Sequence, residues 1–126
     1  MGKFILCIDD SEVIKISLET LLSQNGYESD HAYNGKEGLE KVKKYTEENK
    51  KISLIICDVN MPEMDGLTFL KELKKDEKYR FIPVMMLTTE SQIALMQDAK
   101  KNGATGWIVK PFQPENVLNF LRKFAK

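Results

Sequence analysis

The sequence of 126 residues has few of the side chains on which many sites are built: one histidine, one tryptophan and two cysteines. Both cysteines, Cys7 and Cys57, lie inside apolar stretches, and neither has a second cysteine or a histidine at metal-ligand spacing. This pattern argues against a zinc site or a disulfide framework. We interpret both cysteines as small core side chains in a reducing compartment.

An excess of charge of one sign is also missing, since 19 basic residues balance 19 acidic ones. The balance therefore gives no indication of a nucleic-acid or membrane-surface partner. No apolar run approaches the length of a membrane-spanning helix, and the apolar segment from Phe4 to Ile8 is too short for the core of a signal peptide. We expect a cytoplasmic protein that binds neither nucleic acid nor membrane.

The chain has no repeat, no low-complexity stretch and no linker. Its length, with 42% hydrophobic and 30% charged residues, suits one domain around one core. The charge-rich segments from Lys41 to Lys51 and from Lys71 to Lys78 mix both signs, so we interpret them as solvated helix faces. The prediction is a single domain over residues 1–126, without an output domain.

Apolar strand patterns alternate with helical patterns along the whole chain, which is typical of an α/β protein with a doubly wound parallel sheet. The predicted strands are Phe4 to Ile8, Tyr27 to Ala32, Leu54 to Cys57, Phe81 to Leu87 and Thr105 to Val109. The predicted helices begin near Ser11, Asn34, Asp65 and Ser91, and the last one contains Val117, Leu118, Leu121 and Phe124. The second strand is the most polar, as expected of an edge strand.

The stretch from Leu54 to Gly66 organises this pattern. It opens with an apolar run typical of a strand buried on both faces, and Asp58 follows where that strand should end. Pro62 cannot continue a strand, and Asp65 stands where a helix cap is expected. Ligands of open parallel sheets bind just outside the carboxyl ends of the strands. We therefore predict Asp58 at a strand-to-loop corner that faces solvent.

Polar side chains follow four of the predicted strands at their carboxyl ends: Asp9 with Asp10, then Asp58, Thr88 and Lys110. Each of them alone has an ordinary explanation as a helix cap, a turn residue or a surface residue. Together they indicate a site, because three carboxylates at neighbouring strand ends repel one another strongly unless a cation joins them. Oxygen ligands without histidine or cysteine favour Mg²⁺.

This constellation resembles the active site of the response-regulator receiver domains of two-component signalling. The resemblance covers essentially the whole chain. Within that family, Asn60, the segment from Met61 to Gly66 and Glu90 are most similar to the chemotaxis receivers. The resemblance to the receiver family implies a flavodoxin-like fold of three layers, with a five-stranded parallel sheet in the strand order 2-1-3-4-5.

The resemblance also implies a role for each polar residue. Asp58 would accept a phosphoryl group from a histidine kinase or from a small acyl phosphate. Lys110 and Thr88 would contact the phosphoryl oxygens, with Asn60 and Glu90 as accessory residues. The implied Mg²⁺ ligands are the carboxylates of Asp10 and Asp58 and the backbone carbonyl of Asn60, with Asp9 acting through water.

The resemblance also bears on Trp107, on the pair Lys110 and Pro111, and on His31. Trp107 lies where receivers carry a switch aromatic that works with Thr88, and its alternative is plain packing on a strand. Lys110 and Pro111 resemble the family's cis peptide. His31 lies on the predicted edge strand, so we expect a surface residue far from the acidic cluster and no phosphorelay histidine.

The expected function is that of a stand-alone, monomeric response regulator in chemotaxis and flagellar motor control. Its implied partners are a chemotaxis-type histidine kinase, a target such as a flagellar motor switch protein, and a phosphatase. The alternative is an intermediate receiver of a phosphorelay, with a phosphotransfer protein as partner. Ile93, Leu95 and Met96 spread around the helix near Ser91, which suggests a partner site beside Trp107 or ordinary packing.

Three other functions compete with this prediction. A Mg²⁺-dependent phosphatase of the haloacid-dehalogenase type needs a second aspartate two residues after its nucleophile, where this chain has Asn60. A flavodoxin-like electron carrier needs a Ser/Thr-rich phosphate loop in place of Asp9 and Asp10. A receiver that has lost its switch would serve as a passive binding module, but the complete set of site residues argues against that. We therefore expect a signalling receiver and not an enzyme.

Overall fold

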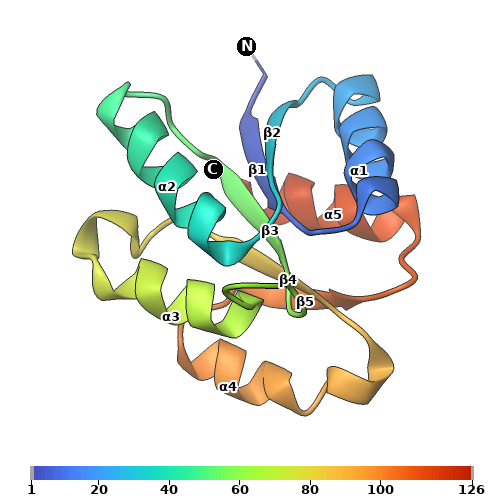
Figure 1. The fold of residues 1–126 in the computed structure, drawn as a ribbon. Coiled ribbons are helices and arrows are strands. Elements are labelled where there is room, and N and C mark those ends of the chain that lie inside the picture. Colours follow the sequence, from blue (N-terminus) through green and yellow to red (C-terminus); the bar gives the residue numbers. More distant parts are fainter. Residues whose placement is uncertain (1, 126) are drawn as a thin grey trace.

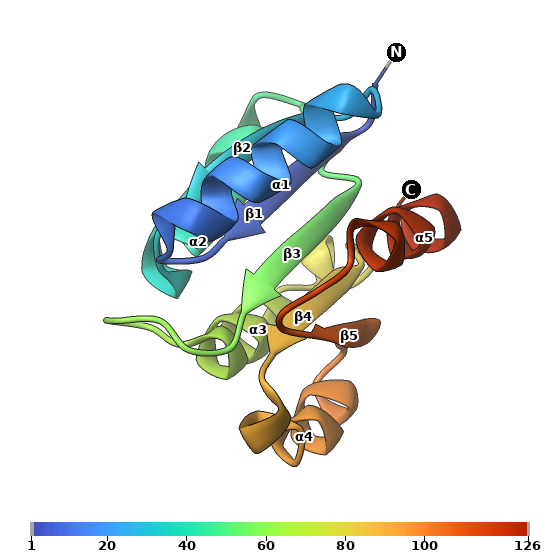
Figure 2. The same ribbon diagram turned by 90° about the vertical axis from the view of Figure 1, so that its right-hand side faces the viewer.

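The computed structural model describes residues 2–125, which form a single five-stranded parallel sheet with helices on both faces (Figures 1 and 2). The strands are β1 (Phe4–Ile8), β2 (Glu28–Ala32), β3 (Leu54–Asp58), β4 (Val84–Thr88) and β5 (Gly106–Val109). The α-helices are α1 (Glu12–Gln24), α2 (Gly35–Glu47), α3 (Gly66–Lys75), α4 (Leu95–Lys101) and α5 (Pro114–Phe124). Two short 3₁₀ turns, η1 (Glu77–Tyr79) and η2 (Glu90–Gln92), precede β4 and α4.

The strand order is β2-β1-β3-β4-β5, as the sequence resemblance implied. Helices α1 and α5 cover one face of the sheet and α2, α3 and α4 cover the other, which gives the predicted three layers (Figure 2). Because the first connection moves to one side of β1 and the later ones to the other, the order reverses beside β1. In such sheets the carboxyl ends at the reversal form the usual ligand site.

Two apolar clusters form the core, one on each face of the sheet. Successive strand residues point to opposite faces, so Leu6 and Ile8 join one cluster while Ile5 and Cys7 join the other. Cys57 packs in the first cluster, so the two cysteines lie on opposite sides of the sheet. Both are free and buried, which confirms their interpretation as core side chains.

Three predicted helix caps are confirmed by hydrogen bonds. The side chain of Ser11 accepts the N–H of Ile14 at 3.3 Å at the start of α1. Asn34 does the same for α2 and Asp65 for α3, with donor–acceptor distances of 2.8 Å. Each such cap stabilises a protein by about 1 kcal/mol, and together they set where the chain leaves the carboxyl edge of the sheet.

Two predicted element starts were wrong. Strand β4 begins at Val84 and not at Phe81, because the N–H of Ile82 closes a turn on the carbonyl of Tyr79 at 3.1 Å. Phe81 is 84% exposed. The helix expected from Ser91 begins at Leu95, because the hydroxyl of Thr89 bonds the side chains that follow it and the chain first makes the 3₁₀ turn η2.

Candidate metal centre at the carboxyl edge of the sheet

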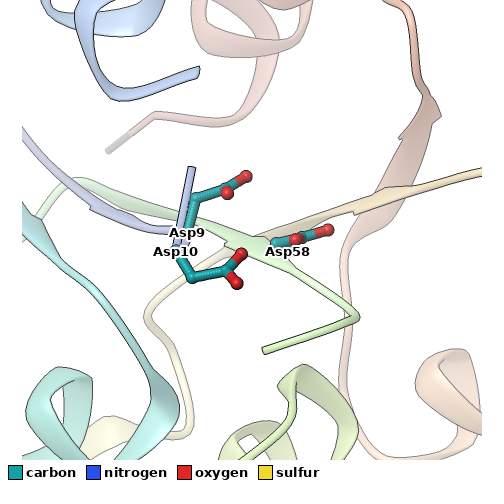
Figure 3. Close-up of side chains that lie close together, drawn as sticks. All are labelled: Asp9, Asp10 and Asp58. Carbon is teal, nitrogen blue, oxygen red and sulfur yellow. The ribbon is translucent and has the colours of Figure 1, made fainter. Parts of the chain in front are cut away.

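Three aspartates lie together where β1 and β3 end. Asp9 and Asp10 follow β1, and Asp58 is the last residue of β3. Since Ile8 is in register with Cys57, the next residues on the two strands, Asp9 and Asp58, stand side by side. One carboxylate oxygen from each aspartate lies within 4.8 Å of the others, and the side chains reach into the same region (Figure 3). The predicted convergence of the three carboxylates is confirmed.

The three carboxylates differ in burial. Asp10 is exposed, whereas Asp9 is 1% and Asp58 4% exposed. The prediction that Asp58 faces solvent was wrong. Asp58 still pairs with Leu87 of β4, and the N–H of Val59 bonds the carbonyl of Leu87 at 3.1 Å, so the ladder continues past the aspartate and covers it.

Lys110 brings a positive charge to the two buried carboxylates. Its Nζ lies 2.9 Å from Oδ1 of Asp58 and 3.8 Å from Oδ2 of Asp9. The lysine directly follows β5, and its backbone N–H bonds the carbonyl of Thr88 at 2.6 Å. This bond fixes the position of the Lys110 backbone beside the end of β4. The Lys110–Pro111 peptide bond is cis, as predicted. A partly buried ion pair of this kind is screened less by water than one on the surface.

Asp9 has an incomplete set of partners. Its Oδ1 accepts the N–H of Ser11 at 2.9 Å, whereas its buried Oδ2 has no hydrogen-bond partner among residues 2–125. Burial raises the pKa of Asp9 to about 6, the Ser11 N–H opposes that shift, and the charge of Asp58 adds to it. An unpaired carboxylate oxygen beside two further carboxylates fits a hard divalent cation with oxygen ligands. The residues present therefore suit a Mg²⁺ site.

Thr88 and Trp107 lie on the two strands beside the cluster. Thr88 ends β4, is fully buried, and donates its hydroxyl hydrogen to the carbonyl of Thr89 at 3.2 Å. Thr88 is in register with Val109, and Trp107 lies two residues before Val109. The two side chains therefore point to the same face of the sheet. The Trp107 side chain is 37% exposed, so it is neither core nor fully solvated.

The loop after β3 carries Asn60, which is exposed, and returns to the sheet at Gly66. The N–H of Gly66 bonds the carbonyl of Val59 at 2.8 Å. A Cβ atom at position 66 would stand 2.1 Å from the carbonyl oxygen of Asp58, so only glycine allows this approach. The sequence places Gly66 directly after the predicted cap Asp65 and gives no indication that it lies against the acidic strand end. Glu90 is exposed on η2, on the loop after β4.

The prediction that His31 is a surface residue far from the acidic cluster was wrong. His31 is 6% exposed, and its Nε2 lies 2.7 Å from the backbone oxygen of Asp9. It is in register with Cys7, so its strand places the ring beside the chain that leads into the acidic cluster. Burial lowers its pKa. Nothing in the sequence indicates this contact, because the pattern of side chains does not show which backbone carbonyl needs a hydrogen-bond donor.

The apolar residues predicted to face a partner divide into two groups. Ile93 and Leu95 are exposed by 40% and 41%, whereas Met96 is fully buried in the core. Met96 therefore does not contribute to an exposed patch. The exposed remainder, together with Trp107, lies on the segments around α4 and β5.

Comparison with known proteins agrees with this geometry. The sequence profile of the family described as the response regulator receiver domain matches residues 5–122. The chain is 35% identical over 127 aligned residues to the chemotaxis protein CheY of Thermotoga maritima, with 100% of both chains covered. It is 37% identical to CheY of Bacillus subtilis, with 98% of each covered. The chemotaxis response regulator CheY4 of Vibrio cholerae superposes with a TM-score of 0.88 at 39% identity, covering 99% and 100% of the two chains.

Within residues 2–125, no helix has the length and apolar character needed to cross a bilayer. The family's members are signalling domains and not enzymes. The family profile, the full-length relatives and the acidic cluster with Lys110 all agree with one another. This chain therefore belongs to the response regulator receiver domain family.

Proposed function

We propose that this receiver domain accepts a phosphoryl group on Asp58 from a histidine kinase in a Mg²⁺-dependent reaction. The observation that carries the proposal is the 2.9 Å contact between Lys110 Nζ and Oδ1 of the buried Asp58, beside the unpaired oxygen of Asp9. A carboxylate between a fixed cation and two further carboxylates that can hold a divalent cation suits a reaction that gathers negative charge. The site roles predicted from the sequence are part of this proposal.

In the proposed reaction, a carboxylate oxygen of Asp58 attacks the phosphorus of a phosphohistidine. The new O–P bond forms an acyl phosphate while the N–P bond breaks, and the imidazole leaves with its electron pair. Lys110 pairs with the oxygens of the transferred group. A cation held by Asp10, Asp58 and the carbonyl of Asn60, with Asp9 acting through water, would neutralise the remaining charge.

The Thr88 hydroxyl has only a weak partner in this structure, the carbonyl of Thr89 at 3.2 Å. Rotation about its χ1 would let the hydroxyl donate to a phosphoryl oxygen on Asp58 instead. That bond is charge-assisted and therefore about twice as strong as the one it replaces. Phosphorylation would thus move the Thr88 side chain at the end of β4 and change the space available beside Trp107.

The test is treatment with acetyl phosphate and Mg²⁺ followed by intact mass measurement. We expect a mass increase of one phosphoryl group, none in Asp58→Asn, and none without Mg²⁺. Asp65→Asn is the matched control, because Asp65 is an exposed aspartate nearby whose capping role an amide also performs. Equal labelling of Asp58→Asn would falsify the assignment of the acceptor.

We further propose that the phosphorylated form acts in chemotaxis on a flagellar motor switch protein. The support is the full-length match to chemotaxis proteins, together with exposed Ile93, Leu95 and Trp107 as a surface that a target can read. The test is titration of the motor switch protein from the same organism with the phosphorylated and unphosphorylated forms. Equal affinity of the two forms would refute this target.

Three further properties stay predictions from the sequence: action without an attached output domain, a monomeric state, and a cytoplasmic location. The phosphorelay alternative makes a different prediction for the same phosphorylated protein. A relay intermediate passes its phosphoryl group on to a histidine of a phosphotransfer protein, whereas a motor regulator keeps it until hydrolysis. The fate of the label after a kinase reaction separates the two.

A further inference from the structure

The end of the molecule opposite the acidic cluster carries an unusual aromatic residue. Phe81 lies in the short segment between η1 and β4, the yellow part of the chain that leads into β4 in Figure 1, and is 84% exposed. A phenylalanine normally buries most of its ring, because its apolar area is large. The turn that keeps Ile82 out of the ladder also holds Phe81 out of the core. Its exposure therefore needs an explanation.

The segment that presents Phe81 is held in place by Lys74. The Nζ of this lysine donates to the carbonyl oxygens of Tyr79 at 3.2 Å, Arg80 at 3.0 Å and Ile82 at 2.7 Å. Lys74 is half-buried, and this burial lowers the pKa of its ammonium group. These three bonds fix the backbone on both sides of Phe81. Because this segment is already ordered, a partner that binds the ring loses little free energy in ordering it.

An apolar hollow of about 310 Å³ opens on one side of Phe81. Ile52, Tyr79, Phe81, Ile82 and Pro83 form its walls, and Lys50 and Lys78 stand at its rim. The hollow is large enough for one bulky side chain, and none of its lining residues is acidic. An apolar group with negative charge beside it is the chemistry that this surface complements.

A basic hollow lies on the other side of the same segment. Arg80 lines it together with Lys71, Lys75 and Lys101, and again no acidic residue is among the lining residues. Arg80 also lies over the ring of Phe81, 5.3 Å from its centroid, so two consecutive residues join the two hollows. Arginine and aromatic residues are the side chains most often found at the energetic centre of protein interfaces.

Two cations of the basic hollow are engaged in exposed ion pairs. Lys71 pairs with Asp98 at 3.2 Å, and Arg80 with Glu77 at 3.8 Å. Exposed pairs of this kind contribute little, because water and salt screen them. A carboxylate of a binding partner can therefore replace them at small cost.

We propose that Phe81, Arg80 and the two hollows beside them form a docking surface for an acidic segment of a partner protein that carries one bulky apolar side chain. The apolar side chain enters the 310 Å³ hollow against Phe81, and the carboxylates pair with Arg80, Lys71 and Lys101. A second copy of this chain is the wrong occupant, since a two-fold interface would place the basic hollow against itself. A membrane is disfavoured too, because a single aromatic ring beside a concave hollow offers little area for insertion.

This docking surface is separate from the proposed phosphorylation site. Phe81 precedes β4 at its amino end and Thr88 closes β4 at its carboxyl end. Strand β4 spans Val84–Thr88, so its two ends alone are roughly 13 Å apart at about 3.3 Å per residue. Binding at Phe81 is therefore expected to be the same for the phosphorylated and unphosphorylated forms. Such a surface would hold the receiver beside its partner while the opposite end of the molecule changes between its unphosphorylated and phosphorylated states.

The test is a nuclear magnetic resonance titration of the ¹⁵N-labelled protein with a synthetic peptide, acetyl-Glu-Asp-Phe-Glu-Asp-amide. We expect amide shifts confined to residues 46–52, 71–83 and 101–103. Phe81→Ser and Arg80→Glu should each lower the affinity about tenfold, as expected for residues at the centre of an interface. Both side chains are exposed, so neither change should unfold the protein.

Two matched control variants distinguish specific docking from nonspecific binding. Val13→Ser removes another exposed apolar side chain, 73% exposed on α1, and Lys123→Glu reverses a charge at the end of α5. Neither should change the affinity for the peptide. A peptide with lysines in place of its acidic residues should not bind. Phosphorylation by acetyl phosphate should be as complete in Phe81→Ser as in the parent protein.

Four outcomes would overturn the proposal. The first is the absence of shifts in the stated ranges, and the second is equal peptide affinity in Phe81→Ser. The third is a concentration-dependent dimer in sedimentation that Phe81→Ser abolishes, which would assign the surface to a second copy of the chain. The fourth is co-sedimentation with phosphatidylglycerol–phosphatidylcholine vesicles that the same variant abolishes, which would assign it to a membrane.

Discussion

Asp9 shows at the scale of one residue how the site stores electrostatic free energy. Its ordinary pKa of 3.8 is raised to about 6, because the carboxylate is buried and Asp58 stands beside it, and the N–H of Ser11 offsets only part of this. The folded protein therefore binds a proton at Asp9 more tightly than the unfolded chain does. Above pH 6, the charged form of Asp9 lowers the stability of the metal-free fold.

This difference predicts the effect of Asp9→Asn on metal-free protein. The contribution of Asp9 to the stability of the parent protein should fall as the pH rises from about 4 through 6, and Asp9→Asn lacks this contribution. At pH 7 the variant should be more stable by up to about 3 kcal/mol, and near pH 4.5 the gain should be much smaller. Urea unfolding with a chelator at both pH values measures this. Asp65→Asn serves as control, and an equal gain at both pH values would contradict the prediction.

His31 leads to a prediction about one proton. A carbonyl oxygen can only accept a hydrogen bond, so the contact of Nε2 with the Asp9 oxygen requires the hydrogen on Nε2. The buried Nδ1 has no partner among residues 2–125 and carries the lone pair. Long-range ¹H–¹⁵N spectra should therefore show the neutral Nε2–H tautomer at pH 7. A protonated ring, or hydrogen on Nδ1, would show that this contact is absent in solution.

Replacing His31 by phenylalanine should destabilise the protein by about 1–3 kcal/mol, because the Asp9 carbonyl would lose a buried donor. The pH dependence has a definite sign. Since burial lowers the pKa of His31, the unfolded chain binds that proton more tightly, and the contribution of His31 to the stability of the parent protein falls as the pH drops below about 6.5. The His31→Phe variant lacks this contribution. Urea unfolding at pH 5.5 and pH 8 compares the two proteins, and a cost below 0.5 kcal/mol, on the order of a surface change, would refute the contact.

The residues of the acidic site were predictable from the sequence, but the burial of their side chains was not. Asp9, Asp58 and Lys110 were identified because each follows an apolar strand. The burial of Asp58 depends on how far the neighbouring strand continues and on a lysine from the far end of the chain. His31 was misjudged for the same reason, since its partner is a backbone atom on another strand.

At the scale of elements, a boundary was predicted correctly where a single local signal marks it, and wrongly where two local structures compete. The caps at Ser11, Asn34 and Asp65 were predicted correctly, because each needs only residues three positions away. The starts of β4 and α4 were predicted too early, because local turns compete there with the regular element. The strand order came from family resemblance, since pairing between distant strands leaves only a weak mark on local patterns.

The loop from β3 to α3 provides an element-scale prediction. Because a Cβ atom at position 66 would stand 2.1 Å from the Asp58 carbonyl oxygen, Gly66→Ala must push the loop away from the strand end. We expect a loss of about 3 kcal/mol in stability, at the upper end for overpacking, together with weaker Mg²⁺ binding.

The control is Gly26→Ala, at a glycine with φ of 82° and open space around it, which should cost only about 1 kcal/mol. Urea unfolding gives the stabilities, and Trp107 fluorescence during a Mg²⁺ titration gives the affinities. Equal costs at the two glycines would show that the loop yields without strain.

At the scale of the whole molecule, the fold separates charges that cancel in the sequence. Helices α3, α4 and α5 each end with two basic residues, and α1, α2 and α5 each carry a glutamate in their first turn. In a parallel sheet every connecting helix runs back toward the strand starts. These glutamates therefore lie toward the strand ends and these basic residues toward the strand starts, which the net charge alone does not reveal.

We propose that phosphorylation at the end of the sheet is coupled to the surface around α4 and β5 through Thr88 and Trp107. Phosphorylation adds roughly −1.5 to −2 charges and three acceptor oxygens at Asp58, within reach of Lys110 and Thr88. Drawing Thr88 toward the phosphoryl group vacates space on the face of the sheet to which Trp107 also points. The indole can then turn inward and change the surface beside Ile93 and Leu95.

The size of this shift follows from the free energies involved. Moving a two-state element from 1:99 to 99:1 takes about 5.5 kcal/mol of differential stabilisation. Charge-assisted hydrogen bonds from Thr88 and Lys110 supply only part of it. We therefore expect an incomplete shift in the free phosphorylated protein and a complete one with a target bound. By linkage, target and phosphoryl group must strengthen each other's binding.

Trp107 reports this switch directly, because it is the only tryptophan in the chain and is 37% exposed. Its fluorescence should change when Mg²⁺ binds and change again on phosphorylation. Thr88→Ala should remove the second change, because no hydroxyl is left to move toward the phosphoryl group. Thr89→Ala, which alters the neighbouring hydroxyl outside the strand, should keep it. Identical spectra of the Mg²⁺-bound protein with and without the phosphoryl group would exclude Trp107 from the switch and leave the acceptor role of Asp58 unaffected.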